Sequence, residues 1–141
     1  HVAIGQGHCG LSDSVCGAET VIWPHMGPWP VYVGFTTSEK KFNKAMKRLG
    51  IKNEPFIMND HSDATLHTLT NQDGKLTCVI TMRKPRKGIT KAQIVAMIAH
   101  EAVHVIQYMR ENLGPLGTEA EAYIVQYITQ SCLIALRDKT C

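Results

Sequence analysis

The spacing of apolar residues along the chain predicts first a strand and then a helix. Residues 31–35 form a run of β-branched and aromatic side chains, which is typical of a short strand. Four apolar residues then recur at helical spacing: Phe42, Ala45, Met46 and Leu49. Ser38 precedes them as a capping residue and Gly50 follows them as a stop signal, so we predict an amphipathic helix between these two positions.

Two further stretches flank a turn sequence. Residues 64–70 and 75–82 have strand-like patterns on either side of the Asn-Gln-Asp-Gly sequence at 71–74. A turn of this kind between two such stretches favours a tight connection of antiparallel strands, so we predict a β-hairpin.

The last third of the chain carries two helical patterns. Thr90 and Gln93 match a T-x-x-Q capping box at the start of a helix over 91–112. The Gly-Pro sequence at 114–115 interrupts that pattern. A second helix is predicted over 118–138, where apolar residues recur too densely for a helix exposed on every side.

This order of elements (strand, helix, hairpin, helix, helix) predicts the α+β class, with a small, mostly antiparallel sheet packed on the two C-terminal helices. Residues 28–141 are expected to form this single domain. Residues 1–27 are rich in Gly, Pro, Ser and Cys and show little periodicity. We interpret them as an irregular segment, either a leader or a vector-derived addition.

Composition and charge narrow the function classes. Of the 141 residues, 44% are hydrophobic and 19% are charged, as in ordinary globular domains. No apolar run approaches the roughly 20 residues of a membrane helix, so no membrane partner is expected. The net charge is only +3, and the basic cluster at residues 83–87 is interpreted as a solvated loop. Nucleic acid is therefore not an expected partner.

The cysteines indicate a reducing compartment. The chain has five cysteines and no C-x-x-C pair, and no basic segment precedes an apolar one as in a signal peptide. We therefore expect mostly reduced thiols in a cytoplasmic protein, with Cys9 and Cys16 as the candidate disulfide.

The main group of potential metal ligands and catalytic residues lies in the first of the two C-terminal helices, at His100-Glu101-Ala102-Val103-His104. On a helix, His100 and His104 stand one turn apart on one face, so both imidazoles can bind one metal ion. Glu101 sits about 100° round the helix, where it reaches a metal-bound water better than the metal. The spacing predicts a Zn²⁺ site with two histidine ligands and Glu101 as general base. Five apolar neighbours are expected to bury this helix: Val95, Ile98, Ala99, Val103 and Ile106.

A catalytic zinc ion needs a third protein ligand, and the candidates are Glu119 and Glu121 at the start of the next helix. Glu119 shares a helix face with Tyr123, whereas Glu121 points roughly the opposite way. Thr118 with Glu121 also matches a capping box, which gives Glu121 a structural role. We therefore favour Glu119, although a helix that begins at Pro115 would remove this capping argument.

These motifs resemble those of the gluzincins, zinc metallopeptidases in which a glutamate of the helix after HExxH is a metal ligand. Residues 119–123 (Glu-Ala-Glu-Ala-Tyr) are similar to that second helix, with Tyr123 where many gluzincins have Asp or Asn. A closer resemblance, over most of residues 28–136, is to small HExxH proteins of tailed phages and prophages, a metallopeptidase family without an assigned substrate. The segments that carry it are 29–35, 38–40, 46–50, 100–107, 119–123 and Gln126.

The resemblance implies a zinc metallopeptidase that acts on a peptide or protein in the cytoplasm of a host cell. Tyr123, Tyr108 and His67 are candidate donors to the oxyanion, and residues 78–82 are the candidate edge strand for a bound peptide. The alternative is a non-catalytic zinc-binding phage protein that acts in assembly or binds a host factor. The two differ at the fourth coordination position, which is open to water only in the enzyme.

Two other sets of potential ligands are weaker. Three residues are interpreted as ordinary polar residues of a loop and an exposed strand face: His61, Asp63 and His67. Four others lack a recognised zinc-knuckle spacing, so no structural zinc is expected at them: His8, Cys9, Cys16 and His25.

Overall fold

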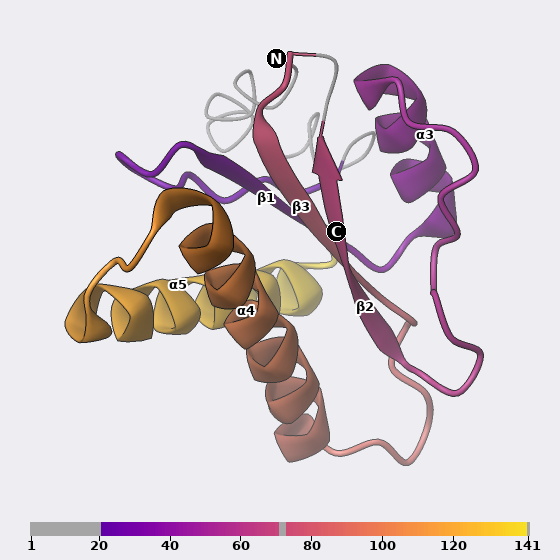
Figure 1. Ribbon diagram of the computed structural model, residues 1–141. Coiled ribbons are helices and arrows are strands. Elements are labelled where there is room, and N and C mark those ends of the chain that lie inside the picture. Colours follow the sequence, from indigo (N-terminus) through magenta and orange to yellow (C-terminus); the bar gives the residue numbers. More distant parts are fainter. Residues whose placement is uncertain (1–20, 71–72, 141) are drawn as a thin grey trace.

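A computed structural model describes residues 21–70 and 73–140 of the chain. Figure 1 shows its helices and strands, coloured along the sequence. In chain order they are strand β1 (Val31–Thr36), helix α3 (Glu39–Leu49), strands β2 (Ala64–Thr70) and β3 (Leu76–Met82), and helices α4 (Lys91–Leu113) and α5 (Thr118–Asp138).

The three strands form one mixed sheet in the order β1-β3-β2. Strand β2 pairs with β3 antiparallel, as the predicted hairpin requires, and β1 pairs with β3 parallel. The α+β class is therefore confirmed, but the sheet has one parallel pair rather than being mostly antiparallel. The hydrophobic pattern predicts the hairpin alone, because only a short turn fixes strand direction locally. It does not say which hairpin strand β1 joins.

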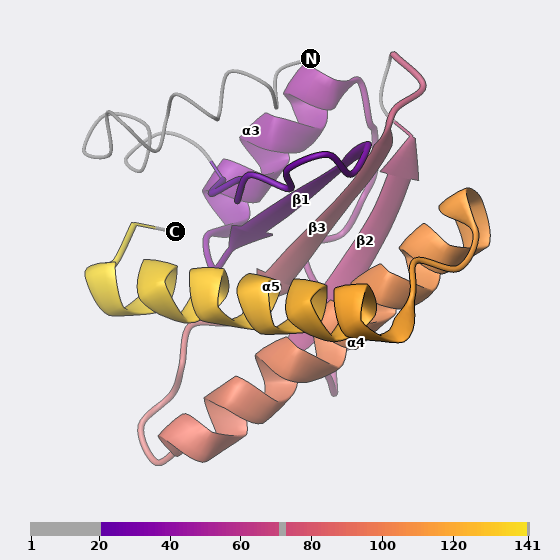
Figure 2. The same ribbon diagram turned by 90° about the vertical axis from the view of Figure 1, so that its left-hand side faces the viewer.

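Helices cover both faces of the sheet. Two views at right angles show α3 on one side and α4 and α5 on the other (Figures 1 and 2). Cys78, Ile80 and Met82 of β3 belong to the larger core cluster, on the α4 and α5 side, and Val79 belongs to the smaller cluster with α3. The central strand is buried on both faces, as expected for a strand with neighbours on both edges and helices on both faces.

The folded unit begins before the expected boundary at residue 28. Val21 is buried, Met26 belongs to the main core, and Ile22 bridges Phe35 of β1 through two main-chain hydrogen bonds. A Cβ at Gly34 would come within 2.9 Å of the Val21 side chain, so this close approach requires glycine. Residues 1–20, with the predicted Cys9–Cys16 pair, lie outside the described residues.

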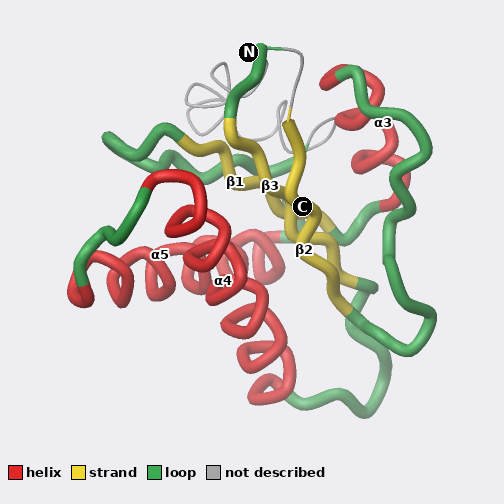
Figure 3. Tube along the Cα trace, in the orientation of Figure 1, coloured by secondary structure: helices red, strands yellow, loops and turns green. Residues whose placement is uncertain are grey.

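Two of the predicted helix starts are confirmed by their caps. Ser38 Oγ accepts from the Lys41 N–H, and both bonds of the Thr90–Gln93 capping box are present. Helix α5 differs, since its N-cap is Gly117 without a side-chain bond, so the capping box expected of Thr118 is not formed. Figure 3 shows the same trace coloured by helix, strand and loop. No helix in the described part of the chain has the length and apolarity to cross a membrane.

Candidate metal centre and cleft

His100 and His104 stand together on the exposed face of α4, one turn apart. Their Nε2 atoms are 3.1 Å apart. Two nitrogen ligands that hold one tetrahedral zinc ion at about 2.0–2.1 Å are themselves about 3.3 Å apart. The two rings therefore already have nearly the separation that a shared zinc ion requires.

Gln107 orients the second histidine. Its Oε1 accepts a hydrogen bond of 2.7 Å from His104 Nδ1. With the proton on Nδ1, the Nε2 lone pair of His104 is directed toward His100 and is available to a metal ion. The sequence contained the signal for this role, because Gln107 lies three residues after His104 on the same helix face.

Glu101 turns toward the sheet rather than toward solvent. Its side chain is buried, with only 8% of the residue exposed, and no described residue forms a hydrogen bond or ion pair with it. A buried carboxylate without a partner is costly. An unpaired carboxylate is nevertheless what a general base needs, and Glu101 and His104 line the same cleft.

This cleft lies between α4 and β2 and has a volume of about 390 Å³. The loop before β2 forms a further wall through Met58, Asn59 and Ser62. Other lining residues come from β2 and α4: Ala64, Thr65, Leu66, Thr68, Glu101, His104, Gln107, Tyr108 and Glu111. The candidate catalytic residues thus face the outer strand of the sheet.

Strand β2 carries free main-chain groups at its outer edge. The Arg83 N–H donates to the Asp63 carbonyl at 2.8 Å, which marks a bonded pair of the antiparallel ladder. Because such pairs alternate, Ala64, Leu66 and Thr68 direct their N–H and C=O groups away from β3. The prediction that residues 78–82 form the edge strand is wrong, because β3 is the central strand.

Of the three candidate oxyanion donors, the structure places Tyr108 in the cleft. Its hydroxyl donates to the Leu69 carbonyl at 3.2 Å, and burial raises the pKa of Tyr108, which keeps the hydroxyl protonated. His67 lies on the opposite face of the sheet, against Phe42 of α3. Tyr123 is 64% exposed on α5 and does not line the cleft.

The two glutamates of α5 are not brought to the histidine pair. Within residues 21–70 and 73–140, no three His, Cys, Asp or Glu side chains form a group that could hold a metal ion. Glu119 is exposed. Glu121 is bound by Arg110 at 2.6 Å, and this hydrogen bond lowers the pKa of Glu121. Seen along the axis of α4, Arg110 lies about 80° from His100, on the side opposite Glu101. Because Arg110 binds Glu121 of α5, helix α5 packs on the side of α4 that faces away from the cleft.

The apolar flanks of α4 also differ from expectation. Val95 and Val103 are exposed, at 39% and 44%. Ile98 and Ile106 are buried as expected, and Ala102, Val105 and Met109 complete the buried face. The helix is therefore buried along a stripe that leaves the two histidines at its exposed border.

Within the described residues, His61, Asp63 and His67 form no group that could hold a metal ion. Asp63 binds Arg86 at 3.1 Å, while His61 is exposed. His67, however, is buried instead of lying on an exposed strand face. His25 accepts a hydrogen bond from the Gly27 N–H, and the other three members of its set lie outside the described residues.

Two cysteines of the described chain, Cys78 and Cys132, are buried in the core. Burial raises the pKa of the Cys78 thiol far above its ordinary value, so this thiol stays protonated and unreactive. Both act as small apolar core residues.

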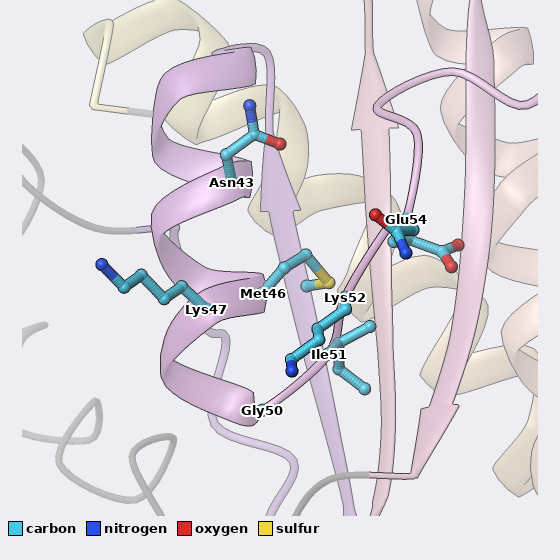
Figure 4. A pocket seen from close by; sticks show the side chains of 8 residues that line it. Asn43, Met46, Lys47, Gly50, Ile51, Lys52 and Glu54 are labelled. Atoms are coloured by element: carbon cyan, nitrogen blue, oxygen red, sulfur yellow. The ribbon is translucent and has the colours of Figure 1, made fainter.

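A second hollow, of about 290 Å³, lies beside the C-terminal end of α3 (Figure 4). Its lining includes Lys47, Lys52 and Glu54. In the close view, the Glu54 side chain turns toward the sheet, where its Oε2 meets His67 Nδ1 at 2.6 Å. Because this carboxylate is already engaged, the hollow offers no free acidic or nucleophilic group of the kind found beside α4.

No family model matches the chain, and no curated protein or solved structure matches it either.

Proposed function

We propose that the protein is a zinc-dependent peptidase in which His100 and His104 bind Zn²⁺ and Glu101 is the general base. The observation that carries this proposal is the arrangement on α4. Two imidazole nitrogens 3.1 Å apart stand on the same helix as the buried residue Glu101, whose carboxylate has no partner among the described residues. The resemblance of the HExxH region to phage-encoded gluzincin-like proteins supports the same assignment.

When bound, zinc supplies a Lewis acid that lowers the pKa of water and polarises a carbonyl. The chain supplies the rest. Glu101 takes the proton of the attacking water and passes it to the leaving amine, which requires a free carboxylate. An extended peptide aligns along the outer edge of β2, whose free N–H and C=O groups add it as a further strand. Tyr108 is the proposed donor to the substrate carbonyl oxygen, which requires its hydroxyl to leave the Leu69 carbonyl when the peptide binds.

A catalytic zinc site takes three protein ligands, and Glu119 stays our proposal for the third. Of the two carboxylates at the start of α5, Glu121 is held by Arg110, whereas Glu119 has no hydrogen bond or ion pair to any described residue. Ligation by Glu119 requires the first turn of α5 to approach the histidines on metal binding.

The rival proposal is a non-catalytic zinc protein with a closed coordination sphere. Both histidines are exposed, His104 lines the cleft, and no further His, Cys, Asp or Glu of the described chain joins them in a group that could hold a metal ion. This favours an open coordination position, as a peptidase needs.

Metal analysis tests whether the protein binds zinc, which the proposal requires. We expect about one zinc ion per chain for the unaltered protein, because His100, His104 and the proposed third ligand Glu119 make up the three protein ligands of a catalytic site. His104→Ala should reduce the bound zinc to background, while His61→Ala, which removes an exposed histidine outside the cleft, should keep it. An unaltered protein that binds no zinc refutes the proposal. A site closed by four protein ligands removes the peptidase claim and leaves the zinc claim standing.

A second prediction concerns Gln107. Gln107→Leu should weaken zinc binding about 10- to 100-fold, the usual effect of removing the hydrogen-bond partner of a ligand histidine. Gln107→Glu retains an acceptor for His104 Nδ1 and should restore most of the affinity. Competition with a chromogenic chelator measures both, with Gln126→Leu on α5 as the matched control. Equal affinities for Gln107→Leu and the unaltered protein would contradict this role.

A further inference from the structure

The cleft beside α4 is acidic although the whole chain carries a net charge of +3. Glu101 and Glu111 are its charged carboxylates, and no lysine or arginine is among its lining residues. The other polar lining residues are Asn59, Ser62, Thr65, Thr68, His104, Gln107 and Tyr108. The proposed zinc ion lies at the His104 end of the cleft, so a ligand at the Glu111 end meets negative charge that no lysine or arginine of the lining offsets.

Glu111 has no partner within the described chain. It has no hydrogen bond or ion pair there, and the nearest arginine in sequence, Arg110, is already bound to Glu121. Glu111 also lies two residues before the end of α4 at Leu113, where the helix dipole favours a cation and disfavours a carboxylate. A residue placed against the local preference often has a functional reason.

A second, independent observation points to a ligand in the same cleft. Glu101 is more than nine-tenths buried, lines this cleft, and has no partner of its own among the described residues. Its burial beside a run of free main-chain groups on β2 indicates a site that is completed by a bound molecule. An extended peptide satisfies both features, because it pairs with the strand edge and brings its carbonyl to the catalytic residues.

The spacing along α4 fixes where the second carboxylate meets such a peptide. Glu111 follows His104 by seven residues, two turns along nearly the same face, which corresponds to about 10 Å of helix. An extended chain covers that length in about three residues. Since Tyr108 binds the Leu69 carbonyl, the later turns of α4 lie beside the C-terminal half of β2. A peptide antiparallel to β2 thus presents residues on the N-terminal side of its scissile bond to Glu111.

We propose that the substrates are extended peptides with a lysine or arginine about three residues from the bond cleaved, and that Glu111 binds this basic side chain. This inference rests on the proposed peptidase function. Glu111 is a specificity residue and takes no part in proton transfer, so its effect falls on the choice of peptide.

A scan of zinc-loaded protein against peptides varied at each position tests the inference. Lysine or arginine about three residues from the cleaved bond should raise kcat/KM about two- to fivefold over norleucine, the effect of one partly exposed ion pair. Glu111→Gln should remove this preference, and Glu111→Lys should reverse it toward acidic residues. The preference should also fall as salt rises. Glu39→Gln, an exposed glutamate of α3, is the matched control.

Three outcomes are distinguishable. Cleavage with a basic preference that Glu111→Gln removes, at an unchanged or higher unfolding temperature, supports the inference. Cleavage without such a preference, or with one that Glu111→Gln leaves intact, overturns the inference and leaves the peptidase proposal standing. Failure of the zinc-loaded protein to cleave any peptide in the scan overturns both.

Discussion

Glu101→Gln is expected to lower kcat/KM for peptide hydrolysis by about 10²- to 10⁴-fold, the usual contribution of a general base. The amide has nearly the shape of the carboxylate, so it fits the buried position beside β2, but it cannot accept the proton of the attacking water. Zinc should remain bound, because His100 and His104 are unchanged and their Nε2 atoms stay close together. The measurement is kcat/KM on a peptide that the unaltered protein cleaves, with metal content determined on the same samples.

The stability of this variant separates a catalytic role from a structural one. Glu101 has no hydrogen bond or ion pair to any described residue, so replacing it with a neutral amide removes no stabilising contact and should not lower the free energy of unfolding. Glu39→Gln, which makes the same chemical change on an exposed site of α3, should retain full activity. A Glu101→Gln protein that keeps more than about a tenth of the activity is inconsistent with a general base. Loss of zinc would instead make Glu101 a ligand.

Local sequence patterns predicted the elements that depend on local interactions. The Thr90–Gln93 capping box, the glycine stop at Gly50 and the hairpin around residues 71–74 each involve neighbours within a few positions. The closeness of His100 and His104 follows in the same way from the helical period alone. These features could be placed without knowledge of the tertiary fold.

Packing between segments far apart in the sequence set the strand order and the position of α5, which local patterns could not predict. The parallel pairing of β1 with β3 makes β2 the edge strand, which moves the expected peptide site from residues 78–82 to the neighbouring strand. The flank of α4 that receives α5 is likewise set by tertiary contacts, and it separates Glu119 from the histidines in the described arrangement. Helical spacing alone gives the direction of a side chain on its own helix and says nothing of where the next helix packs.

His67 illustrates the same limit at a single residue. A histidine in the alternating pattern of an edge strand reads as a polar residue on a solvent-facing side, but α3 and the loop after it cover this side of β2. The side chain is fully buried. Its Nδ1 lies 2.6 Å from Glu54 Oε2, and its Nε2 lies 3.1 Å from the Phe56 carbonyl and 3.0 Å from Thr81 Oγ1.

Replacing His67 with leucine is therefore expected to lower the free energy of unfolding by about 1–3 kcal/mol, the cost of leaving a buried hydrogen-bonding group without its partner. Leucine fills much of the volume, so the loss arises from the partners that remain. The Glu54 carboxylate, whose side chain is only 24% exposed, loses its hydrogen bond to His67, and the Phe56 carbonyl keeps only the one from Thr81. Since domains of this kind are stable by about 5–15 kcal/mol, the change is a large part of the total. Urea unfolding monitored by circular dichroism measures it.

A double-mutant cycle identifies the cause of this loss. If the unpaired carboxylate is responsible, Glu54→Leu in the His67→Leu background should recover part of the stability, because removing both partners costs less than removing one. His61→Leu, an exposed histidine six residues earlier, should change stability by less than about 0.5 kcal/mol. A His67→Leu protein within about 1 kcal/mol of the unaltered one would show that the pair contributes little. Because the residues after Phe56 also form a wall of the cleft, loosening this anchor should weaken peptide binding while zinc stays bound to α4.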